Sequence, residues 1–249
     1  MAAHEKRFAG RPAGDTGAAD PTITGALDAW QRGAGSEHAA LLALSRARLL
    51  VPVVAMLTSV DEQTGAEKES EMALPTLIGR DGRAAIIAFT GVESLARWRP
   101  DARPVVTPAA RVWQAARAEA EAVVIDVAGP VPFVVEGARL AALAVGDQPP
   151  PAHLDPDVRA AIEAVVAAEP AIASASLGPG GAEADLAVTL CLSEPPGLSE
   201  TPGLSETPGL TQAARRTDPA VADAARRAAQ AIAAALAPRL RQGIALSAR

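Results

Sequence analysis

The chain has 249 residues, of which 49% are hydrophobic and 21% charged, and its net charge is -6. This mild acidity disfavours nucleic acid and anionic lipid as partners, because both attract a basic surface. The single cysteine excludes an intrachain disulfide and a metal site built from several cysteines. The amino-terminal residues lack the apolar core of a signal peptide, and no window approaches the roughly 20 apolar residues of a membrane span. We therefore expect a cytoplasmic protein that binds neither nucleic acid nor membranes.

The first quarter of the chain predicts an arm, two helical segments and a strand. Residues 1–20 are rich in Gly, Ala and charge without periodicity, which is typical of a disordered arm. Leu27 and Trp30 share one side of a short helical turn, and Ser36 is a candidate N-cap for the next helix. The apolar run LLVPVVAMLTSV then predicts a strand buried on both faces, with a bulge or an edge at Pro52.

The next segments predict an antiparallel meander followed by alternating helices and strands. A polar loop, DEQTGAEKESE, separates the first strand from EMALPTLIG, and the turn RDGR leads into AAIIAFT. The rest of this part comprises a helix over 92–98, a strand at 105–106, a helix over 108–118, the strands AVVIDV and FVVEG, and the helix ARLAALA. Residues 21–146 are therefore expected to form an α/β (α+β) domain, a mixed sheet with an antiparallel meander flanked by helices.

The remainder of the chain predicts a linker and a smaller domain. GDQPPP favours an extended linker over residues 147–153, since three consecutive prolines cannot continue a helix. Residues 154–249 predict a smaller α+β domain with a helix from Pro156, the strands AIASASL and ADLAVTLCL, a helix over 219–236 and the short strand IALSA. The repeated hexapeptide PGLSET falls in a loop over 192–211, and its few copies cannot build a β-helix. It is interpreted as a surface loop, with a modification site or a partner-binding tract as alternatives.

Four segments follow one another in a characteristic order: RLLVPVVA, KESEMALPTLIGRDGRAAIIAFT, SLARWRPDARPV and AEAVVIDVAGPVPFVVEG. This series, spanning roughly residues 27–145, resembles the SseB amino-terminal domain family, and its order and spacing resemble the actinobacterial members. The resemblance implies no established catalytic activity and no catalytic residues to transfer. The chain departs from the family pattern in the hexapeptide expansion, and in IDVAGP where relatives tend to place a Pro after the Asp or Asn.

Signatures of catalysis are absent from the sequence. There is no GxxxxGK[ST] loop, no strand followed by GxGxxG and no GxSxG elbow, and no two histidines have the i, i+4 spacing of a helical metal site. The acidic stretch around Glu67 lacks the pattern of a calcium loop. Cys191 has no cation nearby in the sequence, which favours a structural role over a reactive thiol. The sequence predicts no catalytic residue, cofactor or metal, and enzymatic activity is left undecided but disfavoured.

Four residues are candidates for a ligand site: Arg97, Arg99, Arg103 and Asp126. Three guanidinium groups within seven positions could bind a carboxylate or phosphate bidentately, and carboxylates at strand ends often line clefts. The alternative is structural. Arg97 and Arg99 would face the free carbonyls of a helix end before Pro100. Arg103 would form a surface ion pair, and Asp126 would stabilise a turn.

The leading hypothesis is a cytoplasmic, non-enzymatic SseB-like protein that acts through a protein partner or as a regulatory binding module, with a homo-oligomer as one possibility. The alternative is a small-molecule or anion-binding protein, or an enzyme without a known signature, that uses an arginine-rich cleft. Phe89 and Trp98 are two of the few aromatic residues. We expect them to pack where the helix over 92–98 meets the sheet.

Overall fold

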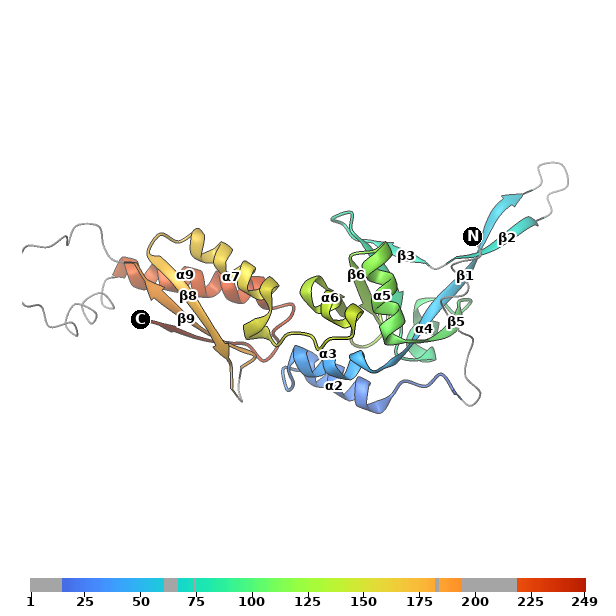
Figure 1. The fold of residues 1–249 in the computed structure, drawn as a ribbon, viewed down its shortest axis with the longest axis horizontal. Helices are drawn as coiled ribbons and strands as arrows, with labels where there is room; N and C mark the ends of the chain where they lie inside the picture. Colours follow the sequence, from blue (N-terminus) through green and yellow to red (C-terminus); the bar gives the residue numbers. More distant parts are fainter. Residues whose placement is uncertain (1–14, 61–66, 74, 182–183, 194–218) are drawn as a thin grey trace, which may run out of the picture. The chain divides into compact units, whose positions relative to one another are not determined.

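The computed structural model describes residues 15–60, 67–73, 75–181, 184–193 and 219–249 (Figure 1). The chain divides into two compact units. Unit 1 comprises Met1–Gln31 and His38–Pro149, and unit 2 comprises Arg32–Glu37 and Pro150–Arg249. The later break falls inside the segment that the sequence predicts as a linker, whereas the grouping of Arg32–Glu37 with unit 2 is not predicted. Most of the predicted hexapeptide loop lies outside the described residues.

Helices and strands are interspersed through unit 1, which confirms the α+β class. In chain order they are α2 (Pro21–Gln31), α3 (Glu37–Ser45, whose first residue belongs to unit 2), β1 (Arg48–Val60), β2 (Glu67–Ala73), β3 (Thr76–Ile78), β4 (Ala84–Ala88), α4 (Val92–Trp98), β5 (Arg103–Pro108), α5 (Ala109–Glu119), β6 (Ala122–Ile125), β7 (Phe133–Glu136) and α6 (Gly137–Val145). α4 has the bounds predicted, but α2 is longer than the turn expected around Leu27 and Trp30. The helix begins earlier than expected because Asp20 precedes its first turn and the Asp20 carboxylate accepts a hydrogen bond from Thr22 N at 2.8 Å.

The strands of unit 1 form two sheets instead of one continuous meander. β1 lies between β2 and β5 and is antiparallel to both, while the second sheet has the order β3-β4-β6-β7. Pro75 stands between β2 and β3 and has no amide hydrogen to continue the first ladder, so the expected strand EMALPTLIG divides in two. Within the second sheet β4 and β6 are parallel, and a bridge between Leu50 and Phe89 links the two sheets.

Helices α5 and α6 cover one face of the four-stranded sheet (Figure 1). Their apolar sides share a core with α2 and α3, in which Trp113 and Leu44 are fully buried. Trp30 of α2 packs edge-on against Phe133 of β7, with 4.8 Å between the ring centroids. Since α2 is fixed by this core, the segment that precedes it is also held close to the sheet.

The opposite side of the four-stranded sheet carries a second apolar cluster beneath α4. Its buried members include Leu50, Ile87, Phe89 and Leu95. Phe89 is completely buried, and the ring of Trp98 lies 5.6 Å from it. The expected packing of both rings between helix and sheet is confirmed, although Trp98 is half-buried and keeps part of its surface in solvent. This contact fixes α4 over the end of β4.

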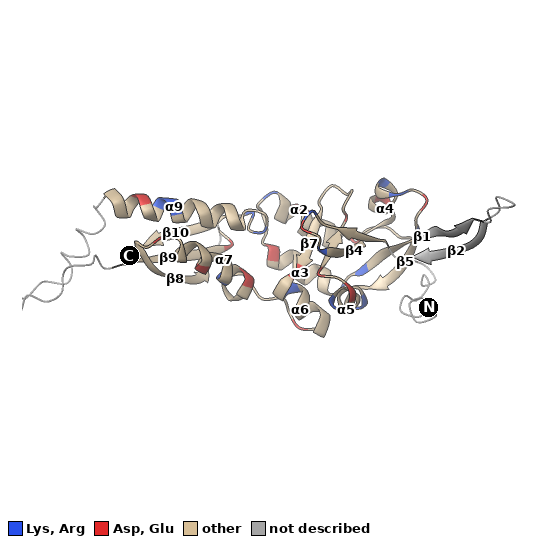
Figure 2. Ribbon diagram, turned by 90° about the horizontal axis from the view of Figure 1, so that it is seen from above, with Lys and Arg blue, Asp and Glu red and all other residues tan. Residues whose placement is uncertain are grey.

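Unit 2 is a small three-stranded sheet with two helices on one face. Its elements are the 3₁₀ helix η1 (Ala152–Leu154), α7 (Pro156–Ala167), β8 (Ile172–Pro179), β9 (Leu186–Leu192), α9 (Pro219–Leu236) and β10 (Ile244–Ala248). β9 is central, parallel to β10 and antiparallel to β8. Val158, Ile162, Val188 and Ile232 lie in the core under α7 and α9. Acidic and basic positions occur together along α9 (Figure 2), where Arg226 and Asp223 pair at 2.6 Å.

A buried ion cluster joins three parts of unit 2. Arg239 donates to Glu37 Oε2 at 3.0 Å and also to Asp155 Oδ2. Asp155 caps α7 as well, because its Oδ1 accepts a hydrogen bond from Asp157 N at 2.8 Å. Both carboxylates are almost completely buried. Removing Arg239 would take a cation away from both buried carboxylates, and its contact with Glu37 ties that residue to unit 2.

Candidate functional site

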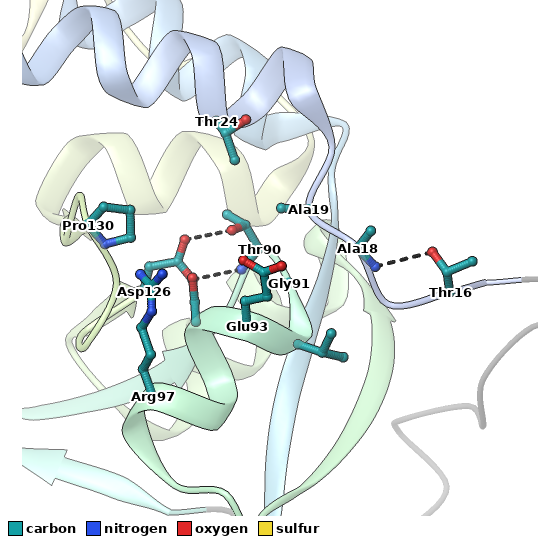
Figure 3. A pocket seen from close by; sticks show the side chains of 12 residues that line it. Thr16, Ala18, Ala19, Thr24, Thr90, Gly91, Glu93, Arg97, Asp126 and Pro130 are labelled. Atoms are coloured by element: carbon teal, nitrogen blue, oxygen red, sulfur yellow. Dashed lines mark hydrogen bonds between the residues drawn. The ribbon is translucent and has the colours of Figure 1, made fainter.

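A pocket of about 380 Å³ opens on unit 1 where the end of β4, the start of α4 and the segment before α2 meet (Figure 3). The segment before α2 lines it with Thr16, Ala18 and Ala19. Hydroxyl groups and charged side chains also line it, from Thr24, Thr90, Ser94, Glu93, Arg97 and Asp126. Several polar groups therefore converge on one concave region, as is typical of small-molecule sites.

Asp126 follows β6 directly and has a φ of 50°, a conformation that few non-glycine residues adopt. Its amide donates to Ala88 O at 2.9 Å, which extends the pairing of β6 with β4 by one residue. Its carbonyl accepts a hydrogen bond from Gly129 N at 2.7 Å and closes a turn. Gly129 has no space for a side chain, because a Cβ there would lie 2.8 Å from Asp126 Cβ. The tight turn places the Asp126 carboxylate across the end of β4.

Thr90, two residues beyond β4, holds the Asp126 carboxylate. Its amide donates to Oδ1 at 2.9 Å and its hydroxyl donates to Oδ2 at 2.6 Å, while Ser94 contributes a further hydrogen bond from α4. Asp126 is only 4% exposed. Burial raises its pKa, and the hydrogen bonds from Thr90 and Ser94 and the positive charge of Arg97 act in the opposite direction. Both carboxylate oxygens are thus already in use as acceptors.

Arg97 extends from the last turn of α4 toward Asp126 and the pocket (Figure 3). Glu93 lies one turn earlier, the spacing and order at which acidic and basic side chains pair well on a helix. Within the described part of the chain, no ion pair joins Arg97 to Glu93, and no other residue accepts a hydrogen bond from Arg97. Since Arg97 is also exposed, its guanidinium group is available to a ligand.

The segment 15–20, which we name the strap, forms the wall of the pocket that precedes α2. Arg48 at the start of β1 holds it: Nε pairs with Asp15 Oδ2 at 2.9 Å, and Nη2 donates to Ala18 O. The same guanidinium group donates through Nη1 to Thr90 O at 2.9 Å. Six residues of the predicted arm therefore make defined contacts, and the rest of that arm lies outside the described residues.

Residues 23–142 match the family model of the SseB protein N-terminal domain. The chain carries an SseB N-terminal domain. This finding confirms the resemblance seen in the four sequence segments, while the actinobacterial affiliation stays a prediction. No curated protein and no solved structure matches the chain. The matched range of the SseB domain includes Thr90, Arg97 and Asp126, whereas the strap precedes it.

The SseB domain brings two of the four candidate residues together and leaves two apart. Arg97 and Asp126 line one pocket. Arg99 pairs with Asp101 at 3.4 Å and lies over the Trp98 ring, 6.0 Å from its centroid. Arg103 belongs to β5, is exposed and does not line the pocket. The sequence predicts a surface ion pair for Arg103. In the structure, Arg99 forms the surface ion pair instead.

Most of the pocket lining is missing from the sequence candidates, including Thr90, Glu93 and the strap. Thr90 directly precedes Gly91, where a Cβ would lie 2.7 Å from Ala19 N. The pair Thr-Gly after a buried strand was a usable signal, because a glycine at such a point often marks a close approach of backbone. The sequence contains no comparable signal for the strap.

Outside the SseB domain, Cys191 lies in a setting that the sequence does not predict. Hydrogen bonds from Arg249 and Ser174 lower the pKa of its thiol, and the charge of Arg249 acts in the same direction. The cation that the neighbouring sequence lacks is supplied by Arg249, 58 positions away in sequence and next to β10. Cys191 thus has a cation beside it in the fold, and its structural role stays a prediction.

Metal sites and membrane-spanning helices are both absent from the described residues. None of their clusters of His, Cys, Asp and Glu has the arrangement of a metal site. No helix among them combines the length and hydropathy needed to cross a membrane.

Proposed function

We propose that the SseB domain of this chain is a non-enzymatic binding module of the cytoplasm whose pocket holds a small acid, through a carboxylate or phosphate group. One observation carries the proposal. Arg97 points into a polar pocket and does not pair with Glu93, although the helical spacing of the two residues favours that pair. A guanidinium group binds carboxylates and phosphates through two parallel hydrogen bonds. The acidic group of the ligand would therefore accept the hydrogen bonds that no described residue accepts from Arg97.

The other charged groups of the pocket have different roles. Asp126 is an anchor, because Thr90 and Ser94 already donate to its carboxylate and it has no free oxygen with which to take a proton from a substrate. This arrangement favours binding over general base catalysis. Glu93 is exposed at the pocket and can accept a hydrogen bond from a donor group elsewhere on the ligand.

Ligand-dependent thermal unfolding tests this proposal. All three tryptophans of the chain, at positions 30, 98 and 113, belong to unit 1, so their fluorescence reports the SseB domain alone. Succinate and inorganic phosphate represent the two acid classes, and glycerol is a neutral probe. At a concentration 100 times its dissociation constant, a bound acid stabilises by about 2.7 kcal/mol, which raises the melting temperature by roughly 5–10 °C. We expect one acid class to produce this rise and glycerol to produce none.

Two arginine variants make the test specific. Arg97→Gln removes the guanidinium group from the pocket and should abolish the rise. Arg103→Gln removes an equally exposed arginine of unit 1 that does not line the pocket, and it should leave the rise intact. If neither acid stabilised the wild-type protein, or if both variants lost the response equally, the proposed function would be wrong.

A protein partner, the other function predicted from the sequence, is favoured by one feature of the SseB domain. β3 is an edge strand of the four-stranded sheet, and its Ile78 is 68% exposed. Exposed sheet edges accept strands from partner proteins. Retention of one stoichiometric partner by the wild-type chain and its loss from Ile78→Lys, together with a flat response to acids, would favour this alternative. Size-exclusion chromatography with light scattering would show whether that partner is a second copy.

A further inference from the structure

The strap has no helix or strand of its own and is attached to the pocket by a few polar contacts. Its backbone lies over α4, where Gly17 O accepts a hydrogen bond from Val92 N at 2.9 Å. Gly17 has a φ of 80°, and a Cβ there would lie 2.5 Å from Val92 Cγ1. The close approach therefore requires glycine, and it leaves the Val92 amide as a reporter of whether the strap is in place.

The stronger attachment is the guanidinium group of Arg48. It binds the Asp15 carboxylate through Nε and Nη2, at 2.9 and 3.3 Å, and it also donates to Ala18 O. The ion pair is only partly shielded, since the Arg48 side chain is 30% exposed and that of Asp15 is 15% exposed. An ion pair with this access to water can open without the large desolvation changes of a buried pair.

Arg48 also connects the strap to the acid pocket. Its Nη1 donates to Thr90 O, and the amide and hydroxyl of Thr90 hold Asp126. One side chain thus contacts the cover of the pocket and the residue that anchors its buried carboxylate. A ligand that displaced the strap or Thr90 would therefore break contacts of Arg48.

We propose that the strap is a movable cover for the pocket and that the pair Arg48–Asp15 is its latch. The latch opens to admit the small acid, and the strap then closes over the acid and slows its release. This inference rests on the proposed function, because the regulated site is the pocket that contains Arg97. The latch itself exists without ligand, so it can be tested separately.

Hydrogen–deuterium exchange on the full chain without ligand tests the latch. Asp15→Asn removes the carboxylate charge that pairs with Arg48 and should speed exchange of the Val92 amide on the order of fivefold. The Leu50 amide, which donates to Phe89 O at 2.8 Å between the two sheets, should keep its wild-type rate and show that the fold is intact. Asp28→Asn in α2 is the matched control and should change neither amide. Unchanged exchange at Val92 in Asp15→Asn would overturn the latch.

A second variant and a ligand arm complete the test. Gly17→Ala should speed exchange at Val92 through steric displacement of the strap, with Asp15 intact. In the wild-type protein, saturating succinate or inorganic phosphate should slow exchange at Val92 by a similar factor of about five. An acid that binds in the thermal assay but leaves Val92 unaffected would refute the cover. Absence of binding by either acid would refute the proposed function, while the ligand-free exchange would still decide the latch.

Discussion

Replacing Asp126 with alanine tests whether this carboxylate anchors the pocket. The change leaves the buried Thr90 amide without its acceptor, which costs about 1–3 kcal/mol. The Thr90 hydroxyl lines the pocket and can turn to water, so its loss adds about 1 kcal/mol. Alanine at a φ of 50° adds about 1 kcal/mol of backbone strain. Relief from burying a carboxylate offsets part of this sum. We expect a net loss of about 3 kcal/mol.

Asp126→Asn is the matched control for this prediction. Asparagine tolerates a positive φ, its oxygen can accept from the Thr90 amide, and its NH₂ group can donate to the Thr90 hydroxyl. We therefore expect a change below about 1 kcal/mol.

Urea unfolding followed by tryptophan fluorescence measures both variants in unit 1. An alanine variant within about 1 kcal/mol of wild type would refute the anchoring role. Equal losses in the asparagine and alanine variants would instead attribute the effect to charge and not to hydrogen-bond geometry.

Three other predictions concern pH, packing and thiol reactivity. Because burial raises the pKa of Asp126, the native state keeps its proton to higher pH than the unfolded chain. Wild type should lose stability relative to Asp126→Asn as pH rises from about 4 through the raised pKa, and parallel urea midpoints would contradict this. Trp98→Ala should cost about 2 kcal/mol, less than the roughly 3–5 kcal/mol of a fully buried ring, because Trp98 is half-buried on Phe89; a loss below about 0.5 kcal/mol would contradict that contact. Arg249→Gln should slow iodoacetamide alkylation of Cys191 at neutral pH and move its pH midpoint upward, whereas an unchanged profile would refute the influence of Arg249.

Elements defined by local pattern could be predicted from the sequence. The helix α4 has the predicted bounds, and so does α9, which begins at Pro219 as helices often do. The packing of Phe89 against Trp98 followed from their places at the ends of adjacent elements. The pairing of strands that are far apart in the sequence could not be predicted in this way. The parallel contact of β4 with β6 pairs residues 37 positions apart, and nothing in either strand encodes its neighbour.

The candidate site shows the same limit. Arg97, Arg99 and Arg103 are close in sequence, but α4 ends at Trp98, so Arg99 has an extended backbone, and the chain has entered a strand by Arg103. The three arginines were grouped because they are close in sequence. Of the three, Arg97 alone lines the pocket. Asp126 was identified because strand ends follow a general rule. The strap lies more than 100 residues before Asp126, and only the folded chain brings the two to one cavity.

Asp126 has a carboxyl group that the fold does not require. Glycine would adopt a φ of 50° without strain, and asparagine would satisfy the Thr90 amide without burying a carboxylate. What a carboxylate alone supplies is negative charge, and the cation that it attracts in the pocket is Arg97. That attraction competes with Glu93, the partner that helical spacing favours for Arg97. The carboxylate therefore keeps the guanidinium group turned into the pocket. An Asp126→Asn variant that unfolds like wild type should consequently bind the small acid more weakly, because Arg97 is then free to pair with Glu93.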